Sequence, residues 1–228
     1  MTLRQTLSGA GLLALTALFA VTLLAGVYAL THQAISNAEH QARLQALTVV
    51  LPADRYDNDP LNDQISVIAP GWLGSDEAMT AWRARRAGAP SMLAIEAVAP
   101  DGYAGTIQLL VSVDAAGHIG AVRVTRHSET PGLGDAIELR RSDWIDHFAG
   151  TSLASPPAAR WKVRKDGGEF DQFAGATITP RAVVAATRRV LQLLEHHGPE
   201  LYAEPADSVL RFSDAPETPV IPSAGREP

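Results

Sequence analysis

The 228-residue chain contains no cysteine, and this absence excludes several kinds of site. Without a thiol there is no disulfide, no thiolate-bound iron–sulfur cluster, no cysteine-ligated zinc and no cysteine nucleophile. The lack of cysteine does not identify the compartment, because chains without cysteine are tolerated everywhere.

Positive charge is also scarce, with 19 Lys and Arg against 25 Asp and Glu, for a net charge of -6 at pH 7. Proteins that bind nucleic acid generally carry an excess of basic residues that contact phosphates. We therefore expect no nucleic-acid partner. The remaining composition, 46% hydrophobic and 19% charged, is that of a globular protein, and the length allows one ordinary domain plus appendages.

A long uncharged run lies near the N-terminus, between residues 9 and 30. About 20 apolar residues span a bilayer, and Arg4 before the run places the N-terminus in the cytoplasm by the positive-inside rule. A cleaved signal peptide is the alternative, but its apolar core is usually about 7–15 residues and no good cleavage site follows the run. We predict a cytoplasmic N-terminus and a single transmembrane anchor over residues 1–31, in a bacterial inner membrane with the rest of the chain periplasmic.

Three further segments follow the predicted anchor. Apolar residues at helical spacing over 32–52 predict a helical stalk that ends at Pro52. Residues 53–203 form the predicted periplasmic domain. Residues 204–228 are rich in proline and acidic residues, and this composition predicts a disordered tail.

The domain reads as α+β, with a small antiparallel or mixed sheet and flanking helices. Strand patterns cover residues 92–98, 106–113 and 119–126, and a hairpin-length turn containing glycine joins the last two. Three other elements are a short helix over 142–148 with Ser142 as N-cap, a short strand over 161–164, and a long helix from Pro180 to about His197 that Gly198-Pro199 stops.

Two groups of side chains outside these motifs also carry an interpretation. Arg83, Arg85 and Arg86 form a small basic cluster, interpreted as a solvated helix face, with lipid headgroups or a partner subunit as alternatives. The four tryptophans are interpreted as core residues.

The segment from Asp171 to Pro180 is the most informative part of the chain. Pro180 suits a first helical position, and Thr179 is a natural N-cap. Thr177 then lies just ahead of a helix N-terminus, where free N–H groups and the helix dipole favour a phosphate. Gly175 and Ala176 have almost no side chain, so that a bulky group can approach the backbone closely.

Two other polar, glycine-rich segments lie at strand ends, over residues 101–106 and 127–134. Binding sites are commonly assembled from such loops on a rigid scaffold. Each residue also has a plainer interpretation. Thr177 is then an ordinary capping residue, and Asp171 forms an Asx turn. Glu129 is a solvated carboxylate, and Thr130-Pro131-Gly132 forms only a turn. Tyr103 covers the edge of the sheet. His127, at a strand end, is interpreted as structural.

The residues from Asp171 to Thr177 resemble the flavinylation motif Asp-x-x-(Ser/Thr)-Gly-Ala-Thr of membrane redox complexes. This motif, the run at 127–134 and Gly102-Tyr103-Ala104-Gly105 occur in the same order as in the FMN-binding domains of Rnf and Na+-translocating NADH:quinone oxidoreductase complexes. The stretch from residue 161 to 184 looks most like the G subunits of Rnf complexes. The resemblance covers roughly residues 1 to 200.

The resemblance implies a covalent flavoprotein in which the hydroxyl of Thr177 carries FMN through a phosphoester bond. The remaining cofactor contacts expected around the phosphate and the flavin ring are Asp171, Gly175, Ala176, Thr179, Tyr103, Glu129, Thr130, Gly132, Leu133 and Gly134. Ala174 stands where the family usually has Ser or Thr, which leaves the acceptor intact.

The implied role is that of an electron-transfer subunit of an ion-translocating complex rather than of a stand-alone enzyme. Such a subunit needs no acid, base or nucleophile of its own. Its partners are the other membrane subunits and a flavin transferase, which uses FAD and its own divalent metal, so no metal site is expected in this chain. The alternative is a membrane-anchored sensor or assembly module that binds FMN or another ligand without relaying electrons.

Overall fold

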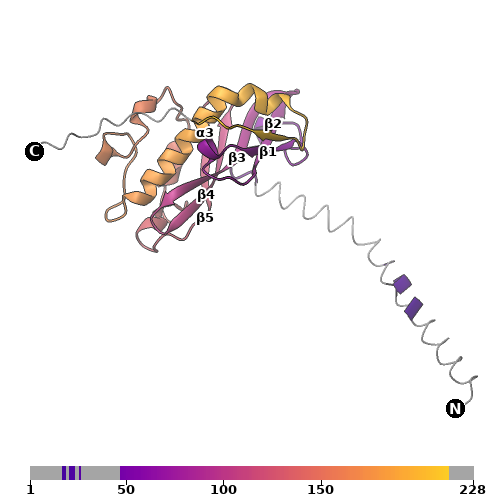
Figure 1. Ribbon diagram of the computed structural model, residues 1–228, viewed down its shortest axis with the longest axis horizontal. Helices are drawn as coiled ribbons and strands as arrows, with labels where there is room; N and C mark the ends of the chain where they lie inside the picture. The colour runs from indigo at the N-terminus through magenta and orange to yellow at the C-terminus, as the bar shows by residue number, and fades with distance from the viewer. Residues whose placement is uncertain (1–16, 19–20, 24–25, 27–46, 216–228) are drawn as a thin grey trace, which may run out of the picture. The chain divides into compact units, whose positions relative to one another are not determined.

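The computed structural model describes residues 17–18, 21–23, 26 and 47–215 (Figure 1). The predicted anchor, the predicted stalk up to residue 46 and the end of the predicted tail fall outside these residues, apart from the few positions named. No helix among the described residues is long and apolar enough to cross a membrane.

The domain is built on one six-stranded sheet in the order β5-β4-β3-β2-β1-β6. All neighbouring strands are antiparallel except β6, which lies parallel to β1. The prediction of a mixed α+β sheet domain is confirmed. The strands are β1 (Gln64–Ile68), β2 (Met79–Arg86), β3 (Ala89–Gly102), β4 (Gly105–Asp114), β5 (Ile119–Arg126) and β6 (Val209–Arg211).

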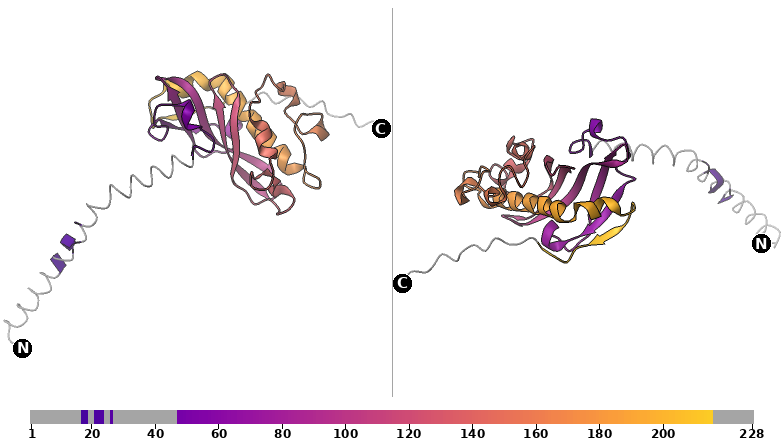
Figure 2. Two further views of the ribbon diagram at one scale, coloured as in Figure 1. Left: turned by 180° about the vertical axis from the view of Figure 1, so that it is seen from behind. Right: turned by 90° about the horizontal axis from the view of Figure 1, so that it is seen from above.

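One long helix, α3 (Ile178–Ala203), lies along one face of this sheet, as Figure 2 shows. Its buried residues, among them Val183, Val190 and Leu191, join inward-facing residues of β3 and β4 in a single core. The other helical segments are short: α2 (Pro70–Leu73) and the 3-10 helices Ala53–Arg55, Gly134–Ile137, Trp144–Phe148, Ala158–Arg160 and Arg164–Asp166.

The opposite face of the sheet carries a smaller apolar cluster. Val50 and Leu51 are buried there against Ala84, Met92 and Ala94. The sequence assigns residues 47–51 to the stalk, but in the structure they pack on the domain.

Aromatic side chains support a long irregular segment between β5 and α3. Phe148 stacks on Phe170 with ring centroids 4.6 Å apart, and Phe170 lies 4.9 Å from Trp161. Trp144 makes edge contacts with Phe148 at 5.3 Å and with Phe173 at 5.1 Å. Such pairs contribute about 0.5–1.5 kcal/mol beyond their buried area, so this cluster fixes a segment that has little regular secondary structure.

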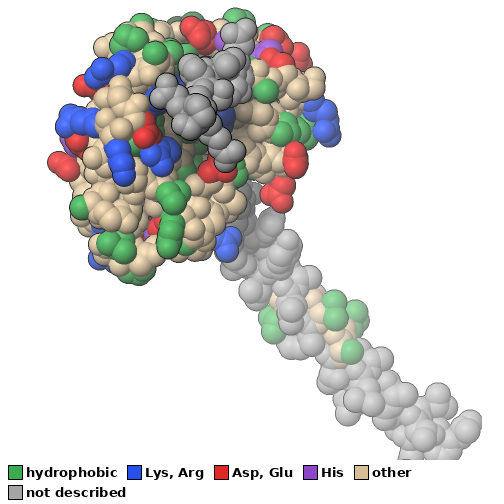
Figure 3. All heavy atoms as spheres, turned by 60° about the vertical axis from the view of Figure 1, so that its left-hand side comes forward, with side chains coloured by type: hydrophobic (Ala, Val, Ile, Leu, Met, Phe, Trp, Pro, Cys, Tyr) green, Lys and Arg blue, Asp and Glu red, His purple; other side chains and the backbone are tan. Residues whose placement is uncertain are grey.

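The tryptophan prediction is confirmed for Trp72, Trp144 and Trp161, which are buried, whereas Trp82 is only partly buried. Figure 3 shows the charged side chains of one face, where basic and acidic residues are intermingled over the domain.

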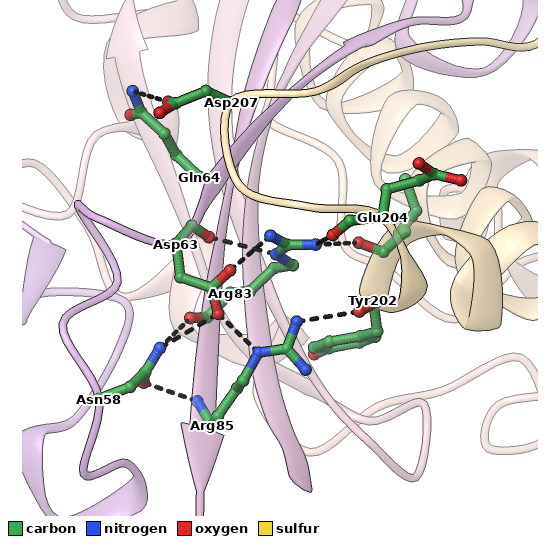
Figure 4. Close-up of polar contacts among 9 residues, drawn as sticks. Asn58, Asp63, Gln64, Arg83, Arg85, Tyr202, Glu204 and Asp207 are labelled. Atoms are coloured by element: carbon green, nitrogen blue, oxygen red, sulfur yellow. Dashed lines mark hydrogen bonds and ion pairs between the residues drawn. The ribbon is translucent and has the colours of Figure 1, made fainter. Parts of the chain in front are cut away.

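The interpretation of the basic cluster as a solvated helix face is wrong, because Arg83 and Arg85 lie on strand β2. The side chain of Arg83 is 1% exposed and pairs with the carboxylate of Asp63. Figure 4 shows its guanidinium group directed at the end of α3, where Nη1 donates to the carbonyls of Leu201 at 3.1 Å and Glu204 at 2.5 Å.

Arg85 completes this arrangement. Its Nε donates to Asp63 Oδ2 at 2.6 Å and its Nη2 to the carbonyl of Tyr202 at 2.9 Å. Two arginines therefore satisfy three carbonyls at the negative end of the helix dipole. This explains a second difference from the sequence prediction: α3 continues through Pro199 to Ala203 instead of ending near His197.

Three smaller predictions need correction. Residues 161–164 form only a single bridge, between Val163 and Phe170, and no strand. The predicted helix at 142–148 is a 3-10 helix from Trp144, and the hydroxyl of Ser142 accepts the N–H of Trp144 at 3.2 Å. Part of the predicted disordered tail is ordered, because β6 pairs with β1 and Phe212 is buried behind it.

The segment after β6 is attached to α3 through His197. Its Nε2 lies 2.8 Å from Asp214 Oδ2 and its Nδ1 lies 3.2 Å from Glu200 Oε1. Burial of the imidazole opposes its charge, but the hydrogen bonds to Asp214 and Glu200 outweigh burial and raise the pKa of His197 above its ordinary value of 6.5. The hydrogen bond from His197 lowers the pKa of Asp214.

Replacing Arg83 by Ala is expected to lower the free energy of unfolding by about 3–5 kcal/mol, because a buried charge partner of Asp63 and two helix-end hydrogen bonds are lost together. Arg86→Ala on the same strand, where the side chain is exposed, is the control and is expected to change stability by less than about 0.5 kcal/mol. Urea unfolding followed by far-ultraviolet circular dichroism measures both. Equal effects in the two variants would contradict the role given to Arg83.

The His197–Asp214 pair is expected to make stability depend on pH. A raised histidine pKa contributes stability that is full below about pH 6.5 and lost as pH rises through the folded-state value; a lowered aspartate pKa contributes stability that is full above about pH 3.9. The urea midpoint of the unaltered chain should therefore exceed that of Asp214→Asn most clearly between these values, and the difference should shrink at alkaline pH. Asp76→Asn, at an exposed position, should show no such pH-dependent difference.

Candidate functional site

The three glycine-rich segments meet at one buried carboxylate, that of Glu129. This side chain is 4% exposed. Its Oε1 accepts the backbone N–H of Ala104 at 3.1 Å, from the turn between β3 and β4. Its Oε2 accepts the hydroxyl proton of Thr179 at 2.6 Å, from the first turn of α3. Of the two interpretations of Glu129, the solvated carboxylate is wrong: both oxygens join parts of the chain that are far apart in sequence.

Two glycines make room for this carboxylate. A Cβ on Gly102 would lie 2.8 Å from Glu129 Oε1, and a Cβ on Gly134 would lie 2.8 Å from Glu129 Oε2 and 3.0 Å from Thr179 Oγ1. Contacts this short do not occur between real side chains. A larger residue at Gly134 therefore displaces Glu129, and one at Gly102 also meets the carbonyl oxygen of Gly105, 2.2 Å from that Cβ. The close packing around Glu129 and Thr179 therefore requires glycine at position 134.

His127 orients the backbone of Glu129. Its Nδ1 accepts the N–H of Glu129 at 3.0 Å, and its Nε2 donates to Glu138 Oε1 at 2.6 Å. Because Nδ1 acts as an acceptor, the ring proton lies on Nε2. Hydrogen bonds from Arg140 and then from His127 hold the pKa of Glu138 well below its usual range. His127 is structural, as predicted.

The segment from Thr130 to Gly134 is a tight turn. The carbonyl of Thr130 accepts the N–H groups of Leu133 at 3.1 Å and Gly134 at 3.0 Å. Gly132 adopts a positive φ of 78°, and its N–H donates to Asp135 Oδ1 at 2.8 Å. Sequence reasoning missed Asp135, which is buried and fixes this turn. The signal available in the sequence was an aspartate three residues after a turn glycine.

The start of α3 differs by one residue from the prediction. The helix begins at Ile178, so that Thr177 and not Thr179 is the N-cap residue. Thr179 lies in the first turn, fully buried, with its hydroxyl given to Glu129. Pro180 is the third helical residue, where its missing N–H still leaves no helical hydrogen bond unmade.

The hydroxyl of Thr177 makes no capping hydrogen bond. Its side chain is half-buried, and no partner for it is found among the described residues. Its carbonyl accepts the N–H of Arg181 at 3.3 Å, the first backbone bond of the helix. The first turn itself contains no acidic residue, and the carboxylate of Glu129 hydrogen-bonds to it through Thr179.

The loop before Thr177 is held by its aromatic neighbours. The N–H of Ala176 donates to the carbonyl of Phe173 at 3.2 Å, and Phe173 packs on Trp144. Gly175 has a positive φ of 80°, and a Cβ there would lie 3.7 Å from Leu133 Cδ2. The Thr177 loop and the Leu133 turn are therefore neighbours.

Asp171 lies at the start of this loop. Its carbonyl accepts the indole N–H of Trp144 at 2.9 Å, and its carboxylate pairs with Arg164 at 2.7 Å. The carboxylate thus bonds to a side chain before it in sequence, which is not the contact of an Asx turn.

Three large apolar side chains are exposed at this end of the domain: Tyr103 at 68%, Leu133 at 46% and Ile178 at 45%. Each directly precedes a residue that contacts Glu129, namely Ala104, Gly134 and Thr179. These three side chains therefore belong to the segments that meet at the Glu129 carboxylate, and Ile178 directly follows Thr177. An open apolar surface next to an anion-favouring helix end suits a ligand with a flat apolar ring and a phosphate.

The pair formed by Glu129 and Thr179 can be measured by a double-mutant cycle. Glu129→Ala and Thr179→Val are each expected to lower the free energy of unfolding by about 1.5–3 kcal/mol, because each leaves a buried polar group without its partner. The double variant should lose less than the sum of the two. Thr125→Val on the exposed end of β5 is the control and should be neutral. Additive losses in the cycle would contradict a direct bond between Glu129 and Thr179.

Comparison with known proteins identifies the family of the chain, and the matched region includes the site around Glu129. The family model described as FMN-binding domain matches residues 102–192, which include all three segments around Glu129. The chain is 49% identical over 202 residues to the G subunit of the ion-translocating oxidoreductase complex from Pseudomonas aeruginosa strain UCBPP-PA14, covering 89% of this chain and 94% of the relative.

Two more distant relatives carry the same name. The relative from Vibrio atlanticus strain LGP32 is 45% identical over 85% of this chain and 92% of its own length. The relative from Shewanella loihica strain PV-4 is 40% identical over 92% of this chain and 99% of its own length. Together with the site geometry, these similarities show that the chain belongs to the family of G subunits of ion-translocating oxidoreductase complexes and contains an FMN-binding domain.

Proposed function

We propose that this chain relays electrons through FMN attached covalently to Thr177 by a phosphoester bond, as the membrane-anchored flavoprotein subunit of an ion-translocating electron transport complex. The observation that carries the proposal is the Thr177 hydroxyl, which is free of hydrogen bonds to the described residues and lies at the N-terminus of a 26-residue helix. The relatives' names and the FMN-binding family model support the cofactor and the complex.

The residues around Thr177 fit a phosphate. The first backbone N–H groups of α3 have no helical acceptor, and groups of this kind at a helix N-terminus can bind a phosphate. Gly175 and Ala176 expose the backbone beside the hydroxyl. Asp171, another residue of the motif, has its negative charge paired with Arg164.

The residues around Glu129 fit a flavin ring. Leu133 and Ile178 offer exposed apolar walls beside Thr177, and Tyr103 offers an aromatic face. The hydroxyl of the exposed Thr130 and the backbone of the turn up to Gly134 supply polar groups at the ring edge. When bound, the flavin supplies one- and two-electron redox chemistry; the protein holds the ring and excludes water from its apolar face.

Attachment requires only a hydroxyl from this chain. A flavin transferase with FAD as donor forms the bond between Thr177 Oγ1 and phosphorus and breaks the pyrophosphate bond of FAD. AMP leaves, and the hydroxyl proton goes to the transferase. Ala174 stands where the usual motif has Ser or Thr, and it is exposed in the same loop. The absence of a hydroxyl at this position therefore leaves no buried polar group without a hydrogen-bond partner.

The proposed placement is on the periplasmic side of the inner membrane, with residues 1–31 as the anchor. The uncharged run from residue 9 to 30 and Arg4 before it support this topology. The other membrane subunits of the complex then supply the electron donor and acceptor. No metal site is part of the proposal, and among residues 47–215 no cluster of metal-ligating side chains is found.

Thr177→Ala, expressed in the native host with its transferase, is expected to lose covalent flavin completely, because the acceptor oxygen is gone. Thr177→Ser keeps a hydroxyl and should retain flavin, and Thr125→Ala is the control for expression. In-gel fluorescence of the denatured protein measures all three. A fluorescent band in Thr177→Ala would overturn the anchor assignment. Flavin that binds covalently but is never reduced in the complex would favour the sensor or assembly module instead.

A further inference from the structure

A cavity lies toward the C-terminal end of α3. It is a cavity of about 750 Å³ bounded by the C-terminal half of α3, the turn between β4 and β5, the start of β3 and residues 152–154. Its first lining residue on the helix, Leu191, is 14 residues beyond Thr177, which is about 20 Å along a helix that rises about 1.5 Å per residue. The cavity is therefore separate from the site around Glu129.

The floor of the cavity is apolar. Leu93, Val113 and Leu191 are buried in it, whereas Leu153 and Leu194 are only partly buried. Gly198 is buried, yet a Cβ built on it would meet no atom within 4 Å. At Gly198 the helix therefore has no side chain, and the space beside it is empty. A volume of this size is within the range of ligand and anchor pockets, about 300–1,000 Å³.

The polar groups of the lining that are free to bind are mainly acceptors. Glu195 makes no ion pair with the described residues, and its carbonyl receives no N–H from Pro199 four residues on. Asp114 contributes a second carboxylate. Its Oδ1 accepts the backbone N–H groups of Ala116 and His118, both at 2.9 Å, and lies 3.5 Å from Nδ1 of the His118 ring, whereas no partner is found for Oδ2 among the described residues.

The one basic side chain that lines the cavity, Arg85, already has partners in the domain. Arg85 pairs with Asp63 and donates to the carbonyl of Tyr202, with its guanidinium 5.6 Å from the Tyr202 ring centroid (Figure 4). Burial raises the pKa of Tyr202, so its hydroxyl stays protonated. The lining therefore has two carboxylates, from Asp114 and Glu195, and one guanidinium group, which is paired with Asp63.

We propose that this cavity is the docking site for a segment of another subunit of the complex, in which an apolar anchor side chain is flanked by Lys or Arg. The anchor fills the space beside Gly198, and the basic group pairs with Glu195 and Asp114. Anchors that fill a desolvated pocket dominate interface energies, and complementary charge at the rim fixes the partner and its register. The inference rests on the proposed membership of a complex, and it places that contact away from the flavin.

Two variants change the cavity without touching the flavin site. Gly198→Leu fills it with a good helix former, and Glu195→Arg reverses the rim charge. Glu204→Arg is the matched control, since Glu204 is exposed just beyond α3 and does not line the cavity. Each variant is expressed with the full complex, and the complex is purified through an affinity tag on this chain. Both cavity variants should reduce co-purification of one other subunit at least tenfold, while the control and the in-gel flavin fluorescence stay unchanged.

A photo-crosslinking residue in place of Leu153 identifies the occupant in the intact complex. The expected product joins this chain to one other subunit, at a peptide with an apolar residue beside Lys or Arg. A crosslink only to lipid, to a peptide without a basic residue, or to nothing would overturn the proposal, as would full subunit retention in both cavity variants. Because flavin fluorescence is read separately, loss of the Thr177 assignment and loss of the docking site are distinguishable outcomes.

Discussion

The buried carboxylate of Glu129 is the interaction on which the geometry of the site depends. Through Ala104 and Thr179 it joins the turn between β3 and β4, the segment after β5 and the first turn of α3. A buried polar group is costly unless it is hydrogen-bonded, so these two bonds favour the arrangement in which the three segments lie together. The aromatic cluster around Trp144 then fixes the loop that carries Thr177.

Helix α3 connects the two ends of the domain, and its two termini offer different backbone groups. The first backbone N–H groups at its N-terminus have no helical acceptor, whereas its C-terminal carbonyls receive the guanidinium groups of Arg83 and Arg85. The same arginines keep the helix intact past Pro199, and that last turn forms a wall of the apolar cavity. The proposed cofactor end and the proposed docking end are thus parts of one rigid element.

What the sequence predicts well are features with local causes. The sequence predicts strand β5 with its observed limits, since alternation and a glycine turn define it, and the ordered motifs indicate which loops meet. What it misses depends on distant partners. Arg83 looks solvated unless the end of α3 is known to lie above β2, and Thr179 looks like a cap until Glu129 takes its hydroxyl. Strand β6 is only three residues long and exists because β1 leaves an edge free.

The central claim is that Thr177, placed by Glu129 at the start of α3, carries FMN. Peptide mass mapping of the unaltered protein from its native host tests it most directly. The account predicts that the peptide containing Thr177 gains the mass of FMN less one water, with the modification localised to that residue by fragmentation. An unmodified Thr177 peptide in cells that contain the transferase, or the same mass gain on another residue, would contradict it.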